Sequence, residues 1–154
     1  MVKQVEVYLD TNILYSYFKK KIEEKISGNN GKEIKIFPFE NSRIVLMSSF
    51  FTLAELVEVF KREINLSKKS IEDFIENEIK ALEIKFLDKA RIDDNFLRWN
   101  LNGLDLKDAI HLSIARENNL ILLTNDLNLV KFAKMENVES LTLRDFKVKL
   151  SNYF

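Results

Sequence analysis

Four acidic residues are placed where the chain is expected to pass from a strand into a helix. They are Asp10, Glu55, Asp108 and Asp126. The first follows the apolar run 5–9, and the last follows the apolar run 120–124. Because the carboxyl ends of parallel strands lie at one edge of an open sheet, where ligands bind, we expect the four carboxylates to converge.

Carboxylates brought together in this way need a cation. Each like-charge pair at ~4 Å costs about 4 kcal/mol at an effective dielectric constant of 20. Oxygen ligands without nitrogen or sulfur favour Mg²⁺ or Mn²⁺, and such ions most often serve the transfer or hydrolysis of phosphate esters. The acidic residues therefore predict a metal-dependent enzyme that acts on phosphate esters.

Each acidic residue also has an explanation as part of a helix cap. Thr52 and Glu55 have the spacing of a capping box, with Thr52 as the N-cap. Asp105 and Asp108 have the same spacing, with Asp105 as the cap. Asp10 and Asp126 can each cap the helix that follows. Taken singly, the residues favour capping. Taken together, four carboxylates at positions where Ser, Thr or Asn would cap as well favour a metal site.

The alternation of strands and helices predicts the fold class. The expected strands cover residues 5–9, 43–48, 84–87, 120–124 and 140–142, with a further edge strand at 32–37 that Pro38 stops. The expected helices cover residues 11–26, 53–64, 67–82, 93–101, 106–118, 126–135 and the C-terminal stretch. This order predicts one α/β domain over residues 1–154, with a central, mainly parallel sheet flanked by helices on both faces.

The composition excludes several other classes of protein. The 154 residues include no Cys and a single His, His111, which excludes disulfides and zinc centres built from His and Cys. The 24 basic and 24 acidic residues give a net charge of +0, which does not indicate a protein that coats nucleic acid. Since the N-terminus lacks a signal peptide and no apolar run is long enough to span a membrane, we expect a cytoplasmic protein.

Four blocks of this sequence resemble the PIN domain family, a fold of metal-dependent nucleases best known from VapC-type toxins. The blocks are an apolar strand leading into Asp-Thr-Asn at 7–14, a strand-end Ser and a helix bearing Glu at 49–56, Asp-Ala-Ile-His-Leu at 108–112, and Thr-Asn-Asp at 124–126. They stand in the family's order, and the resemblance continues to the closing strand and helix start at 141–146. The stretch from about 22 to 42 is longer and more hairpin-like than in small PIN toxins.

The resemblance implies roles for the residues of these blocks. Asp10, Glu55 and Asp108 would be the core ligands of one or two Mg²⁺ or Mn²⁺ ions. Asp126 would complete the site, directly or through water. The polar neighbours that would orient these ligands or contact phosphate are Thr11, Asn12, Thr124 and Asn125. Capping explains the first two equally well, and His111 is expected to be a hydrogen-bonded core histidine.

The same resemblance implies an endoribonuclease that hydrolyses RNA phosphodiester bonds. It would be the toxin of a toxin–antitoxin pair, with RNA as substrate, an antitoxin helix bound along the amphipathic helices over 53–82, and a second copy of itself as a further partner. One alternative is a stand-alone PIN nuclease of RNA processing or decay. A non-catalytic PIN-like binding module is the other, and the complete acidic set disfavours it.

Overall fold

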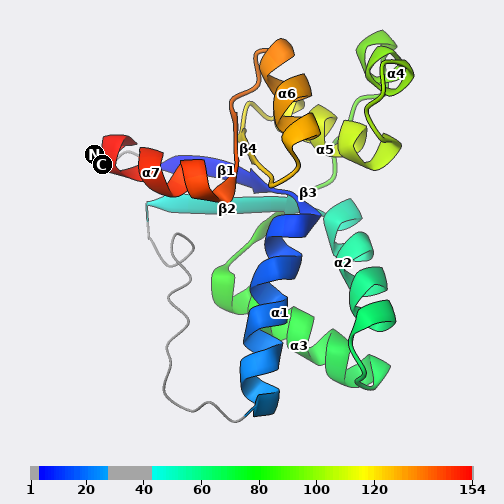
Figure 1. Cartoon of the computed structure of the whole chain (residues 1–154), viewed down its shortest axis with the longest axis vertical. Helices are drawn as coiled ribbons and strands as arrows, with labels where there is room; N and C mark the ends of the chain where they lie inside the picture. The colour runs from blue at the N-terminus through cyan, green and yellow to red at the C-terminus, as the bar shows by residue number, and fades with distance from the viewer. Residues whose placement is uncertain (1–3, 28–42, 154) are drawn as a thin grey trace.

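The central sheet of this computed structural model is entirely parallel, with the strand order β3-β2-β1-β4-β5 (Figure 1). The structure describes residues 4–27 and 43–153. Within them the strands are β1 (Val5–Leu9), β2 (Ile44–Ser49), β3 (Lys85–Leu87), β4 (Ile121–Leu123) and β5 (Ser140–Leu141). The predicted α/β class with a parallel sheet is confirmed.

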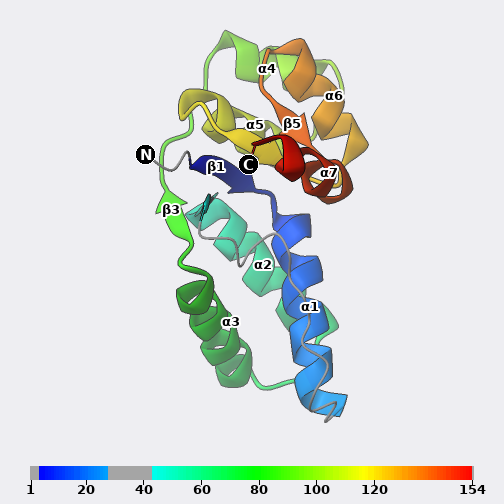
Figure 2. The same ribbon diagram turned by 90° about the vertical axis from the view of Figure 1, so that its left-hand side faces the viewer.

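Helices cover both faces of this sheet, as predicted. They are α1 (Thr11–Ser27), α2 (Phe50–Glu63), α3 (Lys68–Leu82), α4 (Asp94–Leu101), α5 (Leu106–Glu117), α6 (Leu127–Met135) and α7 (Leu143–Tyr153). Helices α1, α2, α3 and α7 contribute to one hydrophobic core, and α4, α5 and α6 contribute to the other (Figure 2). Among the described residues, no helix is both long enough and apolar enough to cross a membrane.

Two hydrophobic cores form because successive side chains of a strand point to opposite faces of the sheet. In β1, Val7 and Leu9 belong to the core under α1 and α2, whereas Tyr8 belongs to the core under α5. In β4, Leu123 and Leu122 divide between the two cores in the same way. β4 and the second half of β1, from Val7 to Leu9, are therefore apolar without interruption, as expected where a strand is covered on both faces.

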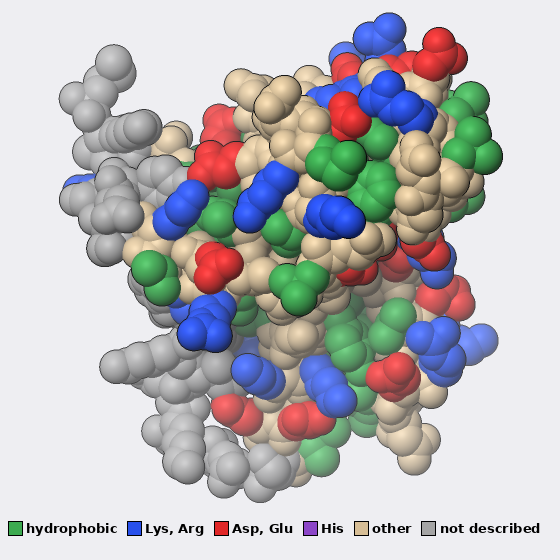
Figure 3. Space-filling model, turned by 45° about the horizontal axis from the view of Figure 1, so that its top comes forward, with side chains coloured by type: hydrophobic (Ala, Val, Ile, Leu, Met, Phe, Trp, Pro, Cys, Tyr) green, Lys and Arg blue, Asp and Glu red, His purple; other side chains and the backbone are tan. Residues whose placement is uncertain are grey.

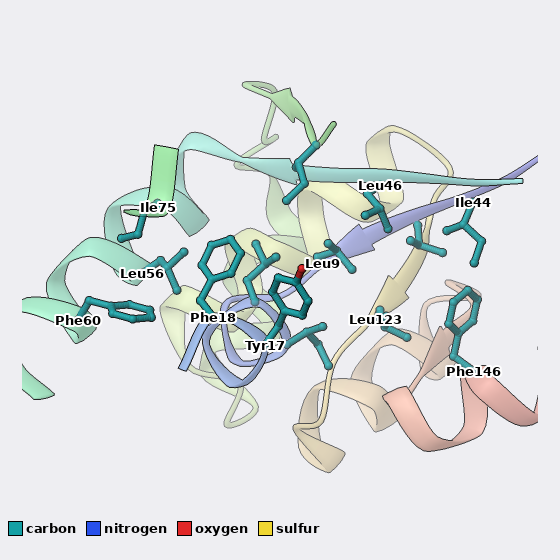
Figure 4. Close-up of a cluster of buried hydrophobic side chains, with 14 of the residues drawn as sticks. Leu9, Tyr17, Phe18, Ile44, Leu46, Leu56, Phe60, Ile75, Leu123 and Phe146 are labelled. Atoms are coloured by element: carbon teal, nitrogen blue, oxygen red, sulfur yellow. The ribbon is translucent and has the colours of Figure 1, made fainter. Parts of the chain in front are cut away.

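The larger core joins four helices to the sheet (Figure 4). Phe18 of α1, Leu56 of α2, Ile75 of α3 and Phe146 of α7 are all at most 2% exposed, and they pack in one cluster with Leu9. Each such buried side chain contributes about 1.5–3 kcal/mol relative to the exposed state. This packing fixes the starts of α1 and α2 at the edge of the sheet where β1 and β2 end.

The strand order places a crevice at the carboxyl ends of β1 and β4. From β1 the chain moves outward through β2 to β3, and it then returns to the other side of β1 to form β4 and β5. The connection after β1 leads to β2 on one side, and the connection after β4 leads to β5 on the other side. Open α/β sheets bind ligands between two strands whose connections diverge in this way. The topology thus selects one edge of the sheet for a functional site.

Three expectations from the sequence need comment. The strand expected at 32–37 lies outside the described residues. The capping box with Thr52 as N-cap is wrong, because β2 runs directly into α2 and Ser49 is the cap, its Oγ accepting a hydrogen bond from the Thr52 N–H at 3.1 Å. The placement of Asp108 after a strand is also wrong, since α5 follows α4 and a short turn.

Candidate functional site

Asp10 and Asp126 are brought together by the pairing of β1 with β4. Asp10 follows Leu9 directly, and Leu9 is in register with Leu123 of β4. Thr124 connects the two acids: its hydroxyl donates to Asp10 Oδ2 at 2.7 Å and accepts from the Asp126 N–H at 3.1 Å. The predicted convergence of these two carboxylates at one edge of the sheet is therefore confirmed.

Glu55 and Asp108 reach the same place from helices on opposite faces of the sheet. Glu55 lies in the second turn of α2, and Asp108 lies in the first turn of α5. All four acidic residues line one cavity of about 540 Å³, together with Thr11 and other residues. The lining of this cavity also includes Asn12, Tyr15, Val59, Lys107 and His111.

Acidic side chains gather in a crease on the right of Figure 3, between the part of the molecule that carries α4–α6 and the part that carries α1–α3. Asp10 is 4% exposed, so its charge is largely removed from water. Its Oδ1 accepts from the Thr11 N–H at 2.6 Å. A buried carboxylate is tolerated only when donors surround it, and Asp10 has them on both oxygens.

His111 lies beneath the cavity and contacts two of the carboxylates. It is 1% exposed, and its Nε2 lies 2.8 Å from Glu55 Oε1 and 3.2 Å from Asp10 Oδ1. Thr11 Oγ1 donates to the same Glu55 oxygen at 2.7 Å. The expectation of a buried, hydrogen-bonded histidine is confirmed, and its partners make it part of the site as well.

A polar network supports His111 from below. Tyr8 OH lies 2.8 Å from His111 Nδ1 and 2.8 Å from Ser49 Oγ, and Thr52 Oγ1 is 3.3 Å away. Burial, opposed by the Ser49 and Thr52 hydrogen bonds and aided by the acidic charges, raises the pKa of Tyr8, so its hydroxyl remains a hydrogen-bond donor. The ring nitrogens of His111 are therefore both engaged, which fixes the orientation of the imidazole.

The pKa values of His111 and Glu55 shift in opposite directions. Burial alone would lower the pKa of His111, but the hydrogen bond to Glu55 and the negative charges of Asp10 and Glu55 outweigh burial and raise it. Burial alone would raise the pKa of Glu55, but the hydrogen bonds from His111 and Thr11 outweigh burial and lower it. The pair therefore favours an imidazolium beside an ionised Glu55.

Asp108 shows the crowding of the acidic residues most clearly. Burial, followed by the charges of Asp10 and Asp126 and a hydrogen bond with Asp126, raises the pKa of Asp108 from 3.8 to about 7. Asp126 also caps α6, because its Oδ1 accepts from the Asn128 and Leu129 N–H groups at 2.9 and 3.2 Å. The capping explanation for Asp126 is thus right, and the residue faces the cavity as well.

The polar neighbours predicted from the sequence take different positions. Thr11 and Asn12 line the cavity, whereas Thr124 is fully buried behind Asp10. Asn12 Oδ1 accepts from the Asn125 N–H at 3.3 Å, and Asn125 Oδ1 accepts from the Leu143 N–H at 3.2 Å. Thr11 and Thr124 therefore contact carboxylates directly, and the two asparagines tie the loop after β4 to its surroundings.

The donor set suits a hard divalent cation, since it consists of carboxylate oxygens with hydroxyl groups behind them. As the side chains of the described residues are arranged, no three Asp, Glu, His or Cys groups converge on one point in the way an ion requires. Glu55 is hydrogen-bonded to His111, whose Nε2 also lies 3.2 Å from Asp10 Oδ1, and the charges of Asp10 and Asp126 help to raise the pKa of Asp108. A cation would compete with the proton of Asp108 for this site.

Two features of the site did not follow from the sequence: the contact of His111 with the carboxylates and the hydrogen bond of Tyr8 to His111. A signal was present in the helix spacing. His111 follows Asp108 by three positions and Thr52 precedes Glu55 by three, and residues three apart share one helix face. A Tyr inside an otherwise apolar strand also needs a buried partner for its hydroxyl.

Comparison with known families identifies the fold. The PIN domain model matches residues 7–135, which include all four acidic residues. The chain belongs to the PIN domain family. PIN domains are generally nucleases, that is, hydrolases. None of the curated protein sequences matches the chain.

Solved structures share this PIN fold at low sequence identity. PAE2754 from Pyrobaculum aerophilum is 17% identical with a TM-score of 0.60, and the match covers 99% of both chains. VapBC-1 from nontypeable Haemophilus influenzae is 18% identical with a TM-score of 0.58, covering 90% of this chain and 98% of that one. VapBC2 from Rickettsia felis, solved bound to a DNA fragment from its promoter, is 16% identical with a TM-score of 0.57 over 90% and 98%.

Proposed function

We propose that this PIN domain is a Mg²⁺- or Mn²⁺-dependent endoribonuclease. The observation that carries the proposal is the convergence of Asp10, Glu55, Asp108 and Asp126 on one cavity at the carboxyl edge of a parallel sheet. The raised pKa of Asp108 supports it, because a carboxyl that holds its proton among other carboxylates can exchange that proton for a cation. Membership of a family of nucleases supports it independently.

The residues of the cavity divide the work. Asp10, Glu55 and Asp108 would hold the ion, and Asp126 would complete the site directly or through water. Thr124 and Thr11 orient these ligands, since their hydroxyls donate to Asp10 and Glu55 respectively. One or two bound ions would supply an activated water and would stabilise negative charge on the phosphate.

His111 would restrain the ligands rather than touch the substrate. From the buried side of the cavity, its Nε2 is hydrogen-bonded to Glu55 and lies 3.2 Å from Asp10 Oδ1. The imidazole therefore holds the two carboxylates at a fixed separation. Tyr8 fixes the imidazole in turn through Nδ1.

We further infer that the enzyme is the toxin of a toxin–antitoxin pair. VapBC-1 from Haemophilus influenzae, VapBC2 from Rickettsia felis and FitAcB from Neisseria gonorrhoeae have this fold, and each match covers at least 88% of the present chain. These likenesses support an antitoxin as partner. Expression of the wild-type protein in a bacterial host should arrest growth, whereas expression of Asp108→Asn should not. Unimpaired growth of cells that express the active enzyme would favour the stand-alone nuclease.

Cleavage of RNA tests the proposed activity. Labelled single-stranded RNAs are incubated with the protein in Mg²⁺, Mn²⁺ or EDTA, alongside Asp108→Asn and the surface control Asp73→Asn on α3. We expect metal-dependent cleavage by the wild type and by Asp73→Asn, with at least a hundredfold loss in Asp108→Asn. Equal cleavage in EDTA, or by Asp108→Asn, would contradict the proposal.

A further inference from the structure

The cavity extends past the acidic residues along two helices. Tyr15 follows Thr11 by four positions on α1, and Val59 follows Glu55 by four positions on α2. Both line the cavity, about one helical turn, ~5.4 Å, beyond the residues that contact the carboxylates. An aromatic and an aliphatic side chain thus form an apolar wall beside a charged site.

The ring of Tyr15 is held in place and remains partly exposed. It is half-buried, packs edge-on against Phe60 with ring centroids 5.4 Å apart, and donates its hydroxyl hydrogen bond to Glu63. Lys19 Nζ lies 5.9 Å from the ring centroid. A rigid aromatic ring with a cation close by is a surface on which a nucleobase can stack.

Lys107 stands at another part of the same cavity. It lies in the first turn of α5, is exposed, and is the one Lys or Arg among the described residues that line the cavity. Within the described part of the chain, its ammonium group makes no hydrogen bond or ion pair that would occupy it, although its charge helps to lower the pKa of Glu55. A free ammonium beside four carboxylates is available to an anionic ligand.

Other basic side chains do not supply this contact as a group. On the face seen in Figure 3, Lys and Arg side chains are scattered among acidic ones and form no continuous patch. The net charge of +0 agrees with this distribution. On this face, attraction of a polyanion therefore depends on single cations such as Lys107 and not on a basic patch.

We propose that the cavity binds one unpaired nucleotide of the RNA beside the bond that is cleaved, with its base against Tyr15 and Val59 and its phosphate against Lys107. The inference rests on the proposed ribonuclease function and adds the side chains of this chain that would contact the base and the phosphate. In a duplex the bases are stacked and paired, so a base reaches Tyr15 only from a single strand or a loop.

Binding and cleavage are measured separately to test this subsite. Fluorescence anisotropy in Ca²⁺ compares the affinity of the wild type, Lys107→Ala and Tyr15→Ala for a labelled single strand and for the matching duplex, at several salt concentrations. We expect the wild type to prefer the single strand. Lys107→Ala should weaken its binding about tenfold and reduce the salt slope by about 1. Tyr15→Ala should weaken it about tenfold with the slope unchanged.

Matched variants separate a contact with RNA from a change in folding. Lys107→Arg and Tyr15→Phe keep the cation and the ring, so they should bind within about twofold of the wild type, as should Lys131→Ala on the exposed side of α6. Binding by Tyr15→Ala or Lys107→Ala equal to that of the wild type, equal affinity for duplex, or no RNA binding at all would overturn the subsite. Single-strand binding without cleavage in Mg²⁺ would instead count against the ribonuclease and leave the subsite standing.

Discussion

Asp10 and Asp108 are both acidic residues of the cavity, yet their surroundings differ. Asp10 accepts hydrogen bonds from the Thr11 N–H and the Thr124 hydroxyl, and His111 lies 3.2 Å away. Asp108 instead faces other carboxyl groups, which together with burial raise its pKa to about 7. The same substitution should therefore have opposite effects on stability at the two positions.

Asp108→Asn should stabilise the metal-free protein at pH 8. The folded-state pKa of about 7 lies above the ordinary value of 3.8, so the contribution of this carboxyl to stability is present below pH 3.8 and is lost as the pH rises through 7. The neutral amide avoids that loss. Denaturant unfolding in EDTA should show a gain over the wild type that grows between pH 5 and pH 8. If Asp108→Asn is less stable than the wild type at pH 8, the charge of Asp108 is not repelled by the neighbouring carboxylates.

Asp10→Asn should destabilise the metal-free protein by about 1–3 kcal/mol, because an amide N–H₂ would face one of the donors that now bind a carboxylate oxygen. Urea unfolding in EDTA at pH 8 measures the change. Asp73→Asn on α3, whose side chain is exposed, is the control and should change stability by less than about 0.5 kcal/mol. Equal stability of Asp10→Asn and the wild type would mean that the hydrogen bonds of Asp10 with Thr11 and Thr124 make no net contribution to the free energy of unfolding.

Among the secondary-structure elements, the start of α2 is special because its N-cap residue, Ser49, is also hydrogen-bonded to Tyr8 in the network beneath the site. Ser49 Oγ accepts from the Thr52 N–H and also contacts Tyr8 OH, which contacts His111. Ser67 caps α3 at an exposed position, where its Oγ accepts from the Ser70 N–H. The two serines have the same local role and different surroundings.

Ser67→Ala should cost about 1 kcal/mol of stability, the ordinary value of an N-cap. Ser49→Ala should cost about 2 kcal/mol or more, since it also removes a partner from the buried Tyr8 hydroxyl. Thermal unfolding of the two variants in EDTA measures both costs. Equal losses would show that the Tyr8 contact adds nothing to the cap.

The elements whose hydrophobic pattern lies within one short segment were predicted correctly from the sequence, and those whose ends depend on tertiary contacts were not. The strands, the parallel class and the order of the helices followed from hydrophobic periodicity, which short segments carry by themselves. The start of α2 was misplaced because Phe50 and Phe51 break the apolar spacing that begins at Leu53, and the cap Ser49 is also the last residue of β2. Tertiary pairing decided that boundary.

The sequence allowed the acidic residues of the candidate site to be predicted, but it did not allow the contacts among the side chains of the site to be predicted. The motifs around Asp10 and Asp126 follow buried strands that pair with each other, so their convergence could be foreseen. The contact of His111 with Glu55 joins α5 and α2 across the sheet edge, at a separation of 56 residues. No periodicity within either helix specifies such a contact.

For the whole molecule, the acidic cavity lies where the two hydrophobic cores meet. Glu55 comes from a helix on one face of the sheet, and Asp108 comes from a helix on the other. A cation held by both would connect the two layers. Mg²⁺ at 100 times its dissociation constant should then stabilise the folded protein by about 2.7 kcal/mol, measured by thermal unfolding.

The same binding should weaken as the pH falls below 7, because protons then compete with the cation for Asp108. The stabilisation by Mg²⁺ should therefore be smaller at pH 5.5 than at pH 8. A stabilisation that is equal at the two pH values would place the ion elsewhere on the molecule.

A metal centre in this cavity is tested by calorimetric titration of the wild type, Asp108→Asn and Asp73→Asn with Mn²⁺ at pH 7. The titration is run in two buffers that differ in ionisation enthalpy. We predict one or two ions bound by the wild type and by Asp73→Asn, with protons released to the buffer, and binding at least tenfold weaker in Asp108→Asn. Equal binding by all three proteins, or no binding by the wild type, would contradict a metal centre in this cavity.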